Sequence, residues 1–191
     1  MSVRYGLLAI LAEVPNHGYQ LKTDFERRTA GSWQLNIGQI YTTLQRLERD
    51  GLVEPLAAIS DHHAAAAAEP QGAEQAPGPR ADDRHAYRIT AAGRAQLEAW
   101  LGQPVVTEGP PRDELTIKVL LAVAAGDIDV TAILQRQRTA SVEQLQAYMR
   151  RKAQADPERD LALLILLDAQ IFRTEAEVRW LDATEARIGQ R

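Results

Sequence analysis

The sequence predicts a mainly α-helical protein built of two modules, and three observations support this class. Hydrophobic residues make up 45% of the 191 residues and aromatic residues only 5%, with many Ala and Leu residues that favour helices. Short helical patterns and two strand-like segments occupy the first hundred residues, whereas longer helical patterns follow. A stretch rich in Gly and Pro separates the two parts. We therefore expect a first module over residues 1–102, a linker over 103–112 and a helical module over 113–191.

Composition excludes several classes of protein. The chain has no Cys, which rules out disulfide scaffolds, thiolate metal sites and Cys nucleophiles, and which fits a cytoplasmic protein. The first ten residues lack the pattern of a signal peptide, and the longest apolar run, Leu161 to Leu167, is too short to span a bilayer. The formal net charge of −4 gives no global sign of nucleic-acid binding. A nucleic-acid partner must therefore be argued from a local surface.

Two short helices are expected before residue 30. The apolar side chains of the first recur at helical spacing until Pro15 ends the pattern; they are Tyr5, Leu8, Leu11 and Ala12. Leu21 and Phe25 form a second short stripe after Gly18.

The third helix has the clearest signals. Asn36 is expected to cap it by accepting the backbone N–H of Gln39, as in a capping box, and Gly51 supplies a left-handed stop. One side of this helix is apolar and consists of Ile37, Ile40, Leu44 and Leu47. The opposite side is polar and consists of Gln39, Thr42, Thr43 and Arg46.

Two strands and a fourth helix follow. Leu52–Pro55 and His85–Ile89 are strand candidates that can pair as a hairpin. The segment between them, about residues 57–83, has almost no large apolar side chains, so we expect a disordered loop. Thr90 is a predicted N-cap of the fourth helix, which should end near Gly102.

Three helices, two strands that flank a loop and a further helix are the order of a winged helix-turn-helix with a β-hairpin wing. In that fold the third helix packs one face into the module and presents the other to the major groove of DNA. Gln39 can pair with adenine, Arg46 can reach guanine or a phosphate, and the two Thr side chains can contact either polar groups on bases or a thymine methyl. A polar face is also what any surface helix shows, so periodicity alone leaves both interpretations open.

Several motifs in order resemble the PadR family of bacterial transcription regulators. They are Tyr5-Gly6-Leu7-Leu8, His17-Gly18-Tyr19-Gln20-Leu21, the run Gly38 to Val53 (GQIYTTLQRLERDGLV), and Tyr87-Arg88-Ile89-Thr90-Ala91-Ala92-Gly93. The resemblance covers about residues 1–101, and the remainder is similar to the longer C-terminal dimerisation domain of one subfamily. It implies a homodimeric repressor of nearby genes that binds a palindromic operator. It also implies release by a small apolar or phenolic effector, an antibiotic or another toxic compound.

The resemblance also assigns roles to residues. The family's glycine-plus-tyrosine signature falls on Gly38 and Tyr41, and its DNA-reading helix falls on Gln39 to Arg46. The expected DNA contacts are Tyr19, Lys22, Asn36, Gln39, Tyr41, Thr42, Thr43, Arg46 and Arg88. Tyr41 has two equal interpretations, phosphate contact or core packing. The wing departs from the family because its loop is long and acidic, which puts strong DNA contacts by the loop in doubt.

The C-terminal module is predicted to contain three helices, over Asp113–Ala125, Val130–Gln154 and Pro157–Ile188. Asp129 or Thr131 is expected to cap the second helix, and Asp156 the third. The last helix begins with a run that is apolar around its circumference, which a three-helix appendage is too small to enclose. We therefore expect dimerisation through a set of four apolar side chains: Leu161, Leu164, Ile165 and Leu167. The alternative is an ordinary helical core within one chain.

Three aromatic residues of this module, Tyr148, Phe172 and Trp180, are candidates for an effector pocket, with simple core packing as the alternative. His62 and His63 lie beside Asp61 without a spaced partner, so we expect no metal site and no cofactor. The sequence contains no Gly-rich phosphate loop, HExxH or GxSxG, which argues against an enzyme. The remaining alternative to a DNA-binding regulator is a winged-helix adaptor that binds another protein.

Overall fold

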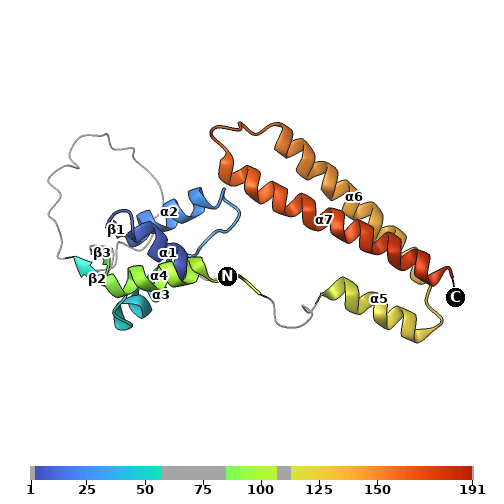
Figure 1. Ribbon diagram of the computed structural model, residues 1–191, viewed down its shortest axis with the longest axis horizontal. Helices are drawn as coiled ribbons and strands as arrows, with labels where there is room; N and C mark the ends of the chain where they lie inside the picture. The colour runs from blue at the N-terminus through green and yellow to red at the C-terminus, as the bar shows by residue number, and fades with distance from the viewer. Residues whose placement is uncertain (1–2, 57–84, 107–112, 191) are drawn as a thin grey trace, which may run out of the picture. The chain divides into compact units, whose positions relative to one another are not determined.

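The structure, a computed structural model, describes residues 3–56, 85–106 and 113–190. Contacts divide the chain into two compact units, Met1–Pro104 and Val105–Arg191. The elements of the first unit, labelled in Figure 1, are α1 (Val3–Leu11), β1 (Asn16–His17), α2 (Gly18–Arg28), α3 (Ile37–Arg49), β2 (Val53–Leu56), β3 (Ala86–Ile89) and α4 (Ala91–Gly102). Those of the second unit are α5 (Glu114–Ala125), α6 (Val130–Ala153) and α7 (Leu161–Ile188). The predicted fold class, mainly α with a small sheet, is confirmed.

The first unit has a continuous core to which all four of its helices and its sheet contribute. Leu7 and Leu8 of α1, Leu21 of α2, and Leu44 and Leu47 of α3 are fully buried there. Each lies on the apolar side of its helix, so amphipathic spacing accounts for the way the helices pack together.

The sheet has three antiparallel strands in the order β1-β3-β2. The predicted hairpin is present, with Val53 opposite Ile89 and Glu54 opposite Arg88. The sequence did not predict β1, whose residues Asn16 and His17 pair with the other edge of β3. The predicted disordered loop at 57–83 lies outside the described residues.

Local capping explains where α3 and α4 begin. The side-chain oxygen of Asn36 accepts the N–H of Gly38 at 2.8 Å, so Asn36 does cap α3, but the predicted partner Gln39 was wrong. Gly51 has φ +70°, the left-handed conformation expected at the end of this helix. Thr90 caps α4 by accepting the N–H of Gly93 at 3.1 Å.

In the second unit, α6 and α7 lie side by side and antiparallel (Figure 1). As the chain advances along α6 from Gln135 to Lys152, its polar partners on α7 run backwards from Glu185 to Asp168. The pairs are Gln135 with Glu185, Arg138 with Asp182 at 2.7 Å, Ser141 with Glu177 at 2.6 Å, and Lys152 with Asp168. The short helix α5 packs against this hairpin through Val119, which is buried with Leu134 and Leu181.

The beginning of α7 differs from the prediction. The helix starts at Leu161 rather than at Pro157, because the Asp156 carboxylate accepts the N–H groups of Glu158 and Arg159 and closes a separate turn. Asp129 caps α6, as one of the two residues expected there, and Asp113, expected as the first residue of the helix, caps α5 instead. The N-cap position of α7 is Asp160 and not the expected Asp156. None of the helices that the structure describes combines the length and apolar character that a bilayer span requires.

Candidate nucleic-acid interface

The outer face of α3 is the polar surface on which the sequence placed the strongest expectation. Ile40, Leu44 and Leu47 are fully buried, whereas Gln39 and Arg46 are exposed. Ile37 was expected on the packed side but is 37% exposed, because it lies in the first turn at the margin of the core. The helix therefore stands with one side fixed in the unit and its polar side free.

The hydroxyl groups of Thr42 and Thr43 are already used within α3. They donate to the carbonyl oxygens of Gly38 and Gln39 at 2.8 and 2.7 Å. Each oxygen keeps a lone pair that can accept a hydrogen bond from a base amino group, and each methyl group can meet a thymine methyl. The side chain of Arg46 has no hydrogen-bond or ion-pair partner among the described residues, so its charge is available to a ligand.

The side chain of Tyr41, a residue of α3, packs against the start of α2. It is half-buried against the core, and a Cβ added at Gly18 would lie 2.6 Å from two carbons of its ring. Only glycine at position 18 allows the ring to lie this close to the backbone of α2. This contact favours the packing interpretation of Tyr41 and gives it a role in setting the position of α3. The sequence motif contained Gly18, but nothing in its spacing revealed this contact.

The first turn of α2 exposes Tyr19, whose side chain is 70% accessible. The other residue predicted there, Lys22, lies 3.5 Å from Glu26 Oε1, and the same oxygen accepts the N–H of Leu35 at 3.1 Å. The ammonium group of Lys22 therefore has a carboxylate beside it, which a DNA phosphate would have to replace. Asn36, another predicted contact, is exposed but uses its oxygen to cap α3.

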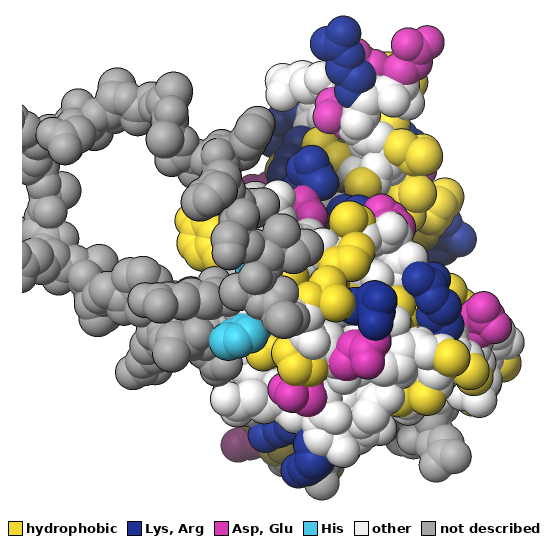
Figure 2. All heavy atoms as spheres, turned by 90° about the vertical axis from the view of Figure 1, so that its left-hand side faces the viewer, with side chains coloured by type: hydrophobic (Ala, Val, Ile, Leu, Met, Phe, Trp, Pro, Cys, Tyr) yellow, Lys and Arg dark blue, Asp and Glu magenta, His cyan; other side chains and the backbone are white. Residues whose placement is uncertain are grey.

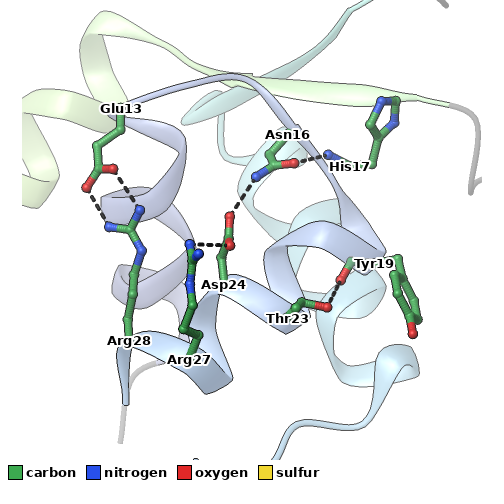
Figure 3. A network of polar contacts seen from close by, with 8 residues as sticks. All are labelled: Glu13, Asn16, His17, Tyr19, Thr23, Asp24, Arg27 and Arg28. Atoms are coloured by element: carbon green, nitrogen blue, oxygen red, sulfur yellow. Dashed lines mark hydrogen bonds and ion pairs between the residues drawn. The ribbon is translucent and has the colours of Figure 1, made fainter. Parts of the chain in front are cut away.

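A buried polar network joins α2 to the sheet, and sequence reasoning missed it (Figure 3). Asn16 of β1 donates from Nδ2 to the carboxylate of Asp24 at 3.1 Å, and its Oδ1 accepts the N–H of His17 at 3.0 Å. Arg27 pairs with the other oxygen of Asp24 at 2.7 Å. Because Asn16 pairs with Tyr87 of β3, this network ties the helix that carries Tyr19 to the strand that carries Arg88.

The wing strands place an acidic residue beside the predicted cation. Arg88 donates from its Nε and one terminal nitrogen to Glu54 Oε1, at 2.9 and 2.6 Å, across the paired strands. Both side chains are about half exposed. On the part of the face in Figure 2 that grey residues leave visible, Lys and Arg side chains are interspersed with Asp and Glu. The predicted contact by Arg88 would therefore compete with Glu54.

The four residues predicted for dimerisation fall into two groups. Leu167 is buried within its own chain and Leu164 is half-buried, so part of the apolar run is packed inside the unit. Leu161 and Ile165 are each 62% exposed.

The three aromatic residues considered for an effector pocket differ in their surroundings. Trp180 lines a groove between α5 and α7, and neither Tyr148 nor Phe172 belongs to its lining. Phe172 is 67% exposed, and the Tyr148 hydroxyl accepts a hydrogen bond from Gln144 at 2.7 Å.

The one group of possible metal ligands that the sequence offered lies at residues 61–63, where we expected no metal site. The part of the chain that the structure describes contains no group of His, Asp or Glu side chains that could hold a metal ion. The histidine pair at 62 and 63 lies outside that part.

The helices, the sheet and the exposed face of α3 together define a winged helix-turn-helix protein with a helical C-terminal domain. Residues 7–64 match the transcriptional regulator PadR-like family, and residues 111–189 match the C-terminal domain of the virulence activator alpha family. The first unit therefore matches the PadR-like family of transcriptional regulators, and this family model and the relatives below describe regulators rather than enzymes. The resemblance found in the sequence is confirmed.

Individual relatives match along the whole chain. A Mycobacterium tuberculosis protein described as a probable transcriptional regulator is 25% identical, with 95% of each chain covered. The negative transcriptional regulator PadR of Bacillus subtilis is 22% identical, with 97% of each chain covered. Crystal structures of that PadR with operator DNA and with p-coumaric acid are 19% and 17% identical to this chain, with TM-scores of 0.59 and 0.64. The first covers 97% of this chain and 98% of its own, and the second covers 98% of each.

Proposed function

We propose that the protein is a homodimeric repressor that binds a palindromic DNA operator through α3 and is released from it by a small effector. Such a protein acts in the cytoplasm, where its operator is accessible. The observation that carries the proposal is the polarity of α3. Its inner side is fully buried at Ile40, Leu44 and Leu47, while Gln39 and Arg46 face outward without bulky apolar neighbours on that side. A helix held in this way fits the major groove of B-DNA, which is about 12 Å wide.

A second copy of the chain would cover apolar side chains that one copy leaves exposed. Leu161, Ile165 and Phe172 of α7 expose most of their apolar surface. Obligate homodimers typically bury about 2,000 Å² or more, with an apolar interface, and a two-fold axis would present two α3 helices to one duplex. Half-sites one helical turn apart, about 34–36 Å, or a multiple of that, are then expected.

Release by an effector is supported by a relative. Bacillus subtilis PadR forms one crystal structure in complex with operator DNA and another in complex with p-coumaric acid. A family member that meets both kinds of ligand makes the same pair of partners a reasonable assignment for this chain.

The test is operator binding by an α3 variant. The DNA upstream of the protein's own gene, cut into short duplexes, identifies the operator by gel shift and footprinting. Arg46→Ala is expected to weaken operator binding by about 1–3 kcal/mol, because one base or phosphate contact is removed. The affinity of the unmodified protein should also fall steeply as salt rises, since Lys and Arg contacts release counterions.

Arg179→Ala is a matched control, because Arg179 is an exposed arginine of α7 that pairs with Glu175 in the second unit. It removes one positive charge and should leave operator affinity unchanged. Equal effects of the two substitutions would remove α3 from the interface. No specific retention of any upstream duplex across several salt concentrations would instead favour the winged-helix adaptor.

A further inference from the structure

The second unit contains a groove of about 420 Å³ between α5 and α7. One wall is apolar and comes from α5 through Val119, Leu120 and Val123. The other wall comes from α7 and includes Trp180, Thr184 and Arg187. Pockets for small organic ligands usually have volumes of about 300–1,000 Å³ and combine apolar walls with a few polar groups, so both size and lining suit such a ligand.

Three of the four polar side chains that line the groove are donors without partners among the described residues, and the fourth, Thr116, donates to Asp113. Trp180, Thr184 and Arg187 lie four and three residues apart, which places them along one side of α7. None of the three side chains has a hydrogen-bond or ion-pair partner within residues 3–56, 85–106 and 113–190. An indole N–H donates only, a guanidinium donates and carries a positive charge, and a hydroxyl can donate. The complementary ligand is therefore an acceptor with negative charge.

The apolar wall of the groove indicates the character of the uncharged part of the ligand. Val119 is buried, and Leu120 and Val123 are 64% and 38% exposed, so the wall offers aliphatic surface that a fully polar anion would leave wet. Inorganic phosphate or sulfate could meet the donors of α7 but has no apolar body to cover the α5 wall. An organic monoanion with an apolar body would contact both walls, with its charged end near Arg187 and its body against Trp180.

We propose that this groove binds a small organic carboxylate with an apolar body, which pairs with Arg187 and bridges α5 to α7. The regulatory part rests on the proposed function, since the ligand would be the effector that releases the operator.

The position of α5 gives the ligand a way to act. Only Val119 and Ala122 of its twelve residues are buried, so α5 is held by a small contact area. It is also the first helix after the segment that links the second unit to α4. A ligand held by both α5 and α7 adds contacts that exist only when α5 is in one position, which is what shifts an equilibrium between two conformations.

The test uses the full chain and isothermal titration calorimetry with 2-naphthoate at neutral pH. Its neutral amide, 2-naphthamide, has nearly the same shape and serves as the charge control. We expect 2-naphthoate to bind at least about tenfold more tightly than the amide. Arg187→Gln should weaken 2-naphthoate about tenfold, as expected for loss of a charge-assisted hydrogen bond, and should leave the amide unchanged. Arg179→Gln, a change on the same helix outside the groove, should affect neither ligand.

A second variant tests the place rather than the charge. Ala183 lines the groove and is exposed, so Ala183→Phe should fill the groove and abolish binding while leaving the circular dichroism spectrum unchanged. The proposal is overturned if 2-naphthoate does not bind, if the acid and the amide bind equally, or if Arg187→Gln behaves like Arg179→Gln. It is also overturned if Ala183→Phe changes the oligomeric state in sedimentation, because the groove would then be covered by a second copy.

The regulatory part is read separately by gel shift with 2-naphthoate. Release of the operator from the unmodified protein but not from Arg187→Gln supports it. Ligand binding without release overturns the regulatory part alone. A protein that retains no operator duplex contradicts the proposed function, while calorimetry still decides whether the groove binds the acid.

Discussion

The two units of the chain solve the problem of burying apolar surface in different ways. In the first unit, the inner faces of α1, α2 and α3 are closed over one another, and Leu7, Leu8 and Leu44 have no exposed surface. In the second unit, Leu161 and Phe172 of α7 are 62% and 67% exposed. The sequence of the first unit thus specifies a core that is complete within one chain. The sequence of the second unit specifies a core whose apolar side chains are only partly covered by its own chain.

The difference follows from the lengths of the helices. The second unit pairs a helix of 24 residues with one of 28, which at 1.5 Å per residue gives a hairpin about 40 Å long. Its third helix, α5, has 12 residues and a length of about 18 Å. It can cover less than half of the hairpin, and it covers the end that contains Leu181. The opposite end, at the start of α7, therefore keeps its apolar side chains exposed.

The largest expected effect comes from a pair of aliphatic truncations, one in each unit. Leu44→Ala should destabilise the first unit by about 3–5 kcal/mol, because it leaves a cavity in a closed core, and this loss should not depend on protein concentration. Ile165→Ala removes exposed surface in the chain, so its cost should come from weaker association of two copies and should grow on dilution. Urea unfolding at two protein concentrations, with sedimentation equilibrium, measures both. If the effect of Ile165→Ala were independent of concentration, the contrast between the units would fail.

A smaller effect is expected at the buried polar contact that ties the sheet to α2. Asn16→Ala removes the donor to Asp24 and the acceptor for His17, which should cost the first unit about 1–3 kcal/mol. Hydrogen exchange at the amide of Tyr87 should accelerate as well, because Asn16 is its strand partner. Gln20→Ala is the control, since this exposed side chain of α2 should change stability by less than about 0.5 kcal/mol. An Asn16 variant as stable as the control would show that the closed core alone fixes the sheet.

Much of the fold could be predicted because it depends on local signals. The cap at Thr90, the left-handed Gly51 and the apolar spacing of α3 are all set within a few residues, and each was confirmed except for Ile37, which is exposed. The strand β1 could not be predicted in the same way. It has two residues, too few for any alternation to appear, and it exists because Asn16 and His17 pair with Tyr87 and Ala86, which lie far along the chain.

The sequence predicted which surface forms the candidate site. It did not predict which charged side chains of that surface have an ion-pair partner. The polar face of α3 follows from helical spacing, and its exposure at Gln39 and Arg46 agrees with it. The sequence could not show that Arg88 faces Glu54, or that Lys22 lies near Glu26, since both depend on the directions of side chains after folding. A run that is apolar on every side also does not reveal which of its residues pack within the chain and which stay exposed.

The smallest expected effect concerns an exposed ion pair that closes the first unit at its surface. Arg28 donates two hydrogen bonds to Glu13, which join the end of α2 to the segment after α1 (Figure 3). The hydrogen bond from Arg28 holds the pKa of Glu13 below its ordinary value. The folded state therefore favours the carboxylate, so the stabilisation is complete above the pKa of the unfolded chain and is lost as pH falls through the lower folded pKa.

Glu13→Gln should accordingly lower the melting temperature slightly at neutral pH, and the difference from the unmodified protein should disappear at low pH. Glu98→Gln on α4 is the control, because Glu98 is exposed and has no ion-pair partner in the part of the chain that the structure describes. Melting curves from neutral pH down to about pH 3 at low and high salt measure the effect, which salt should reduce because the pair is exposed. A difference that persisted unchanged at the lowest pH would mean that Glu13 acts by packing rather than by charge, and that the first unit closes without help from its surface ion pairs.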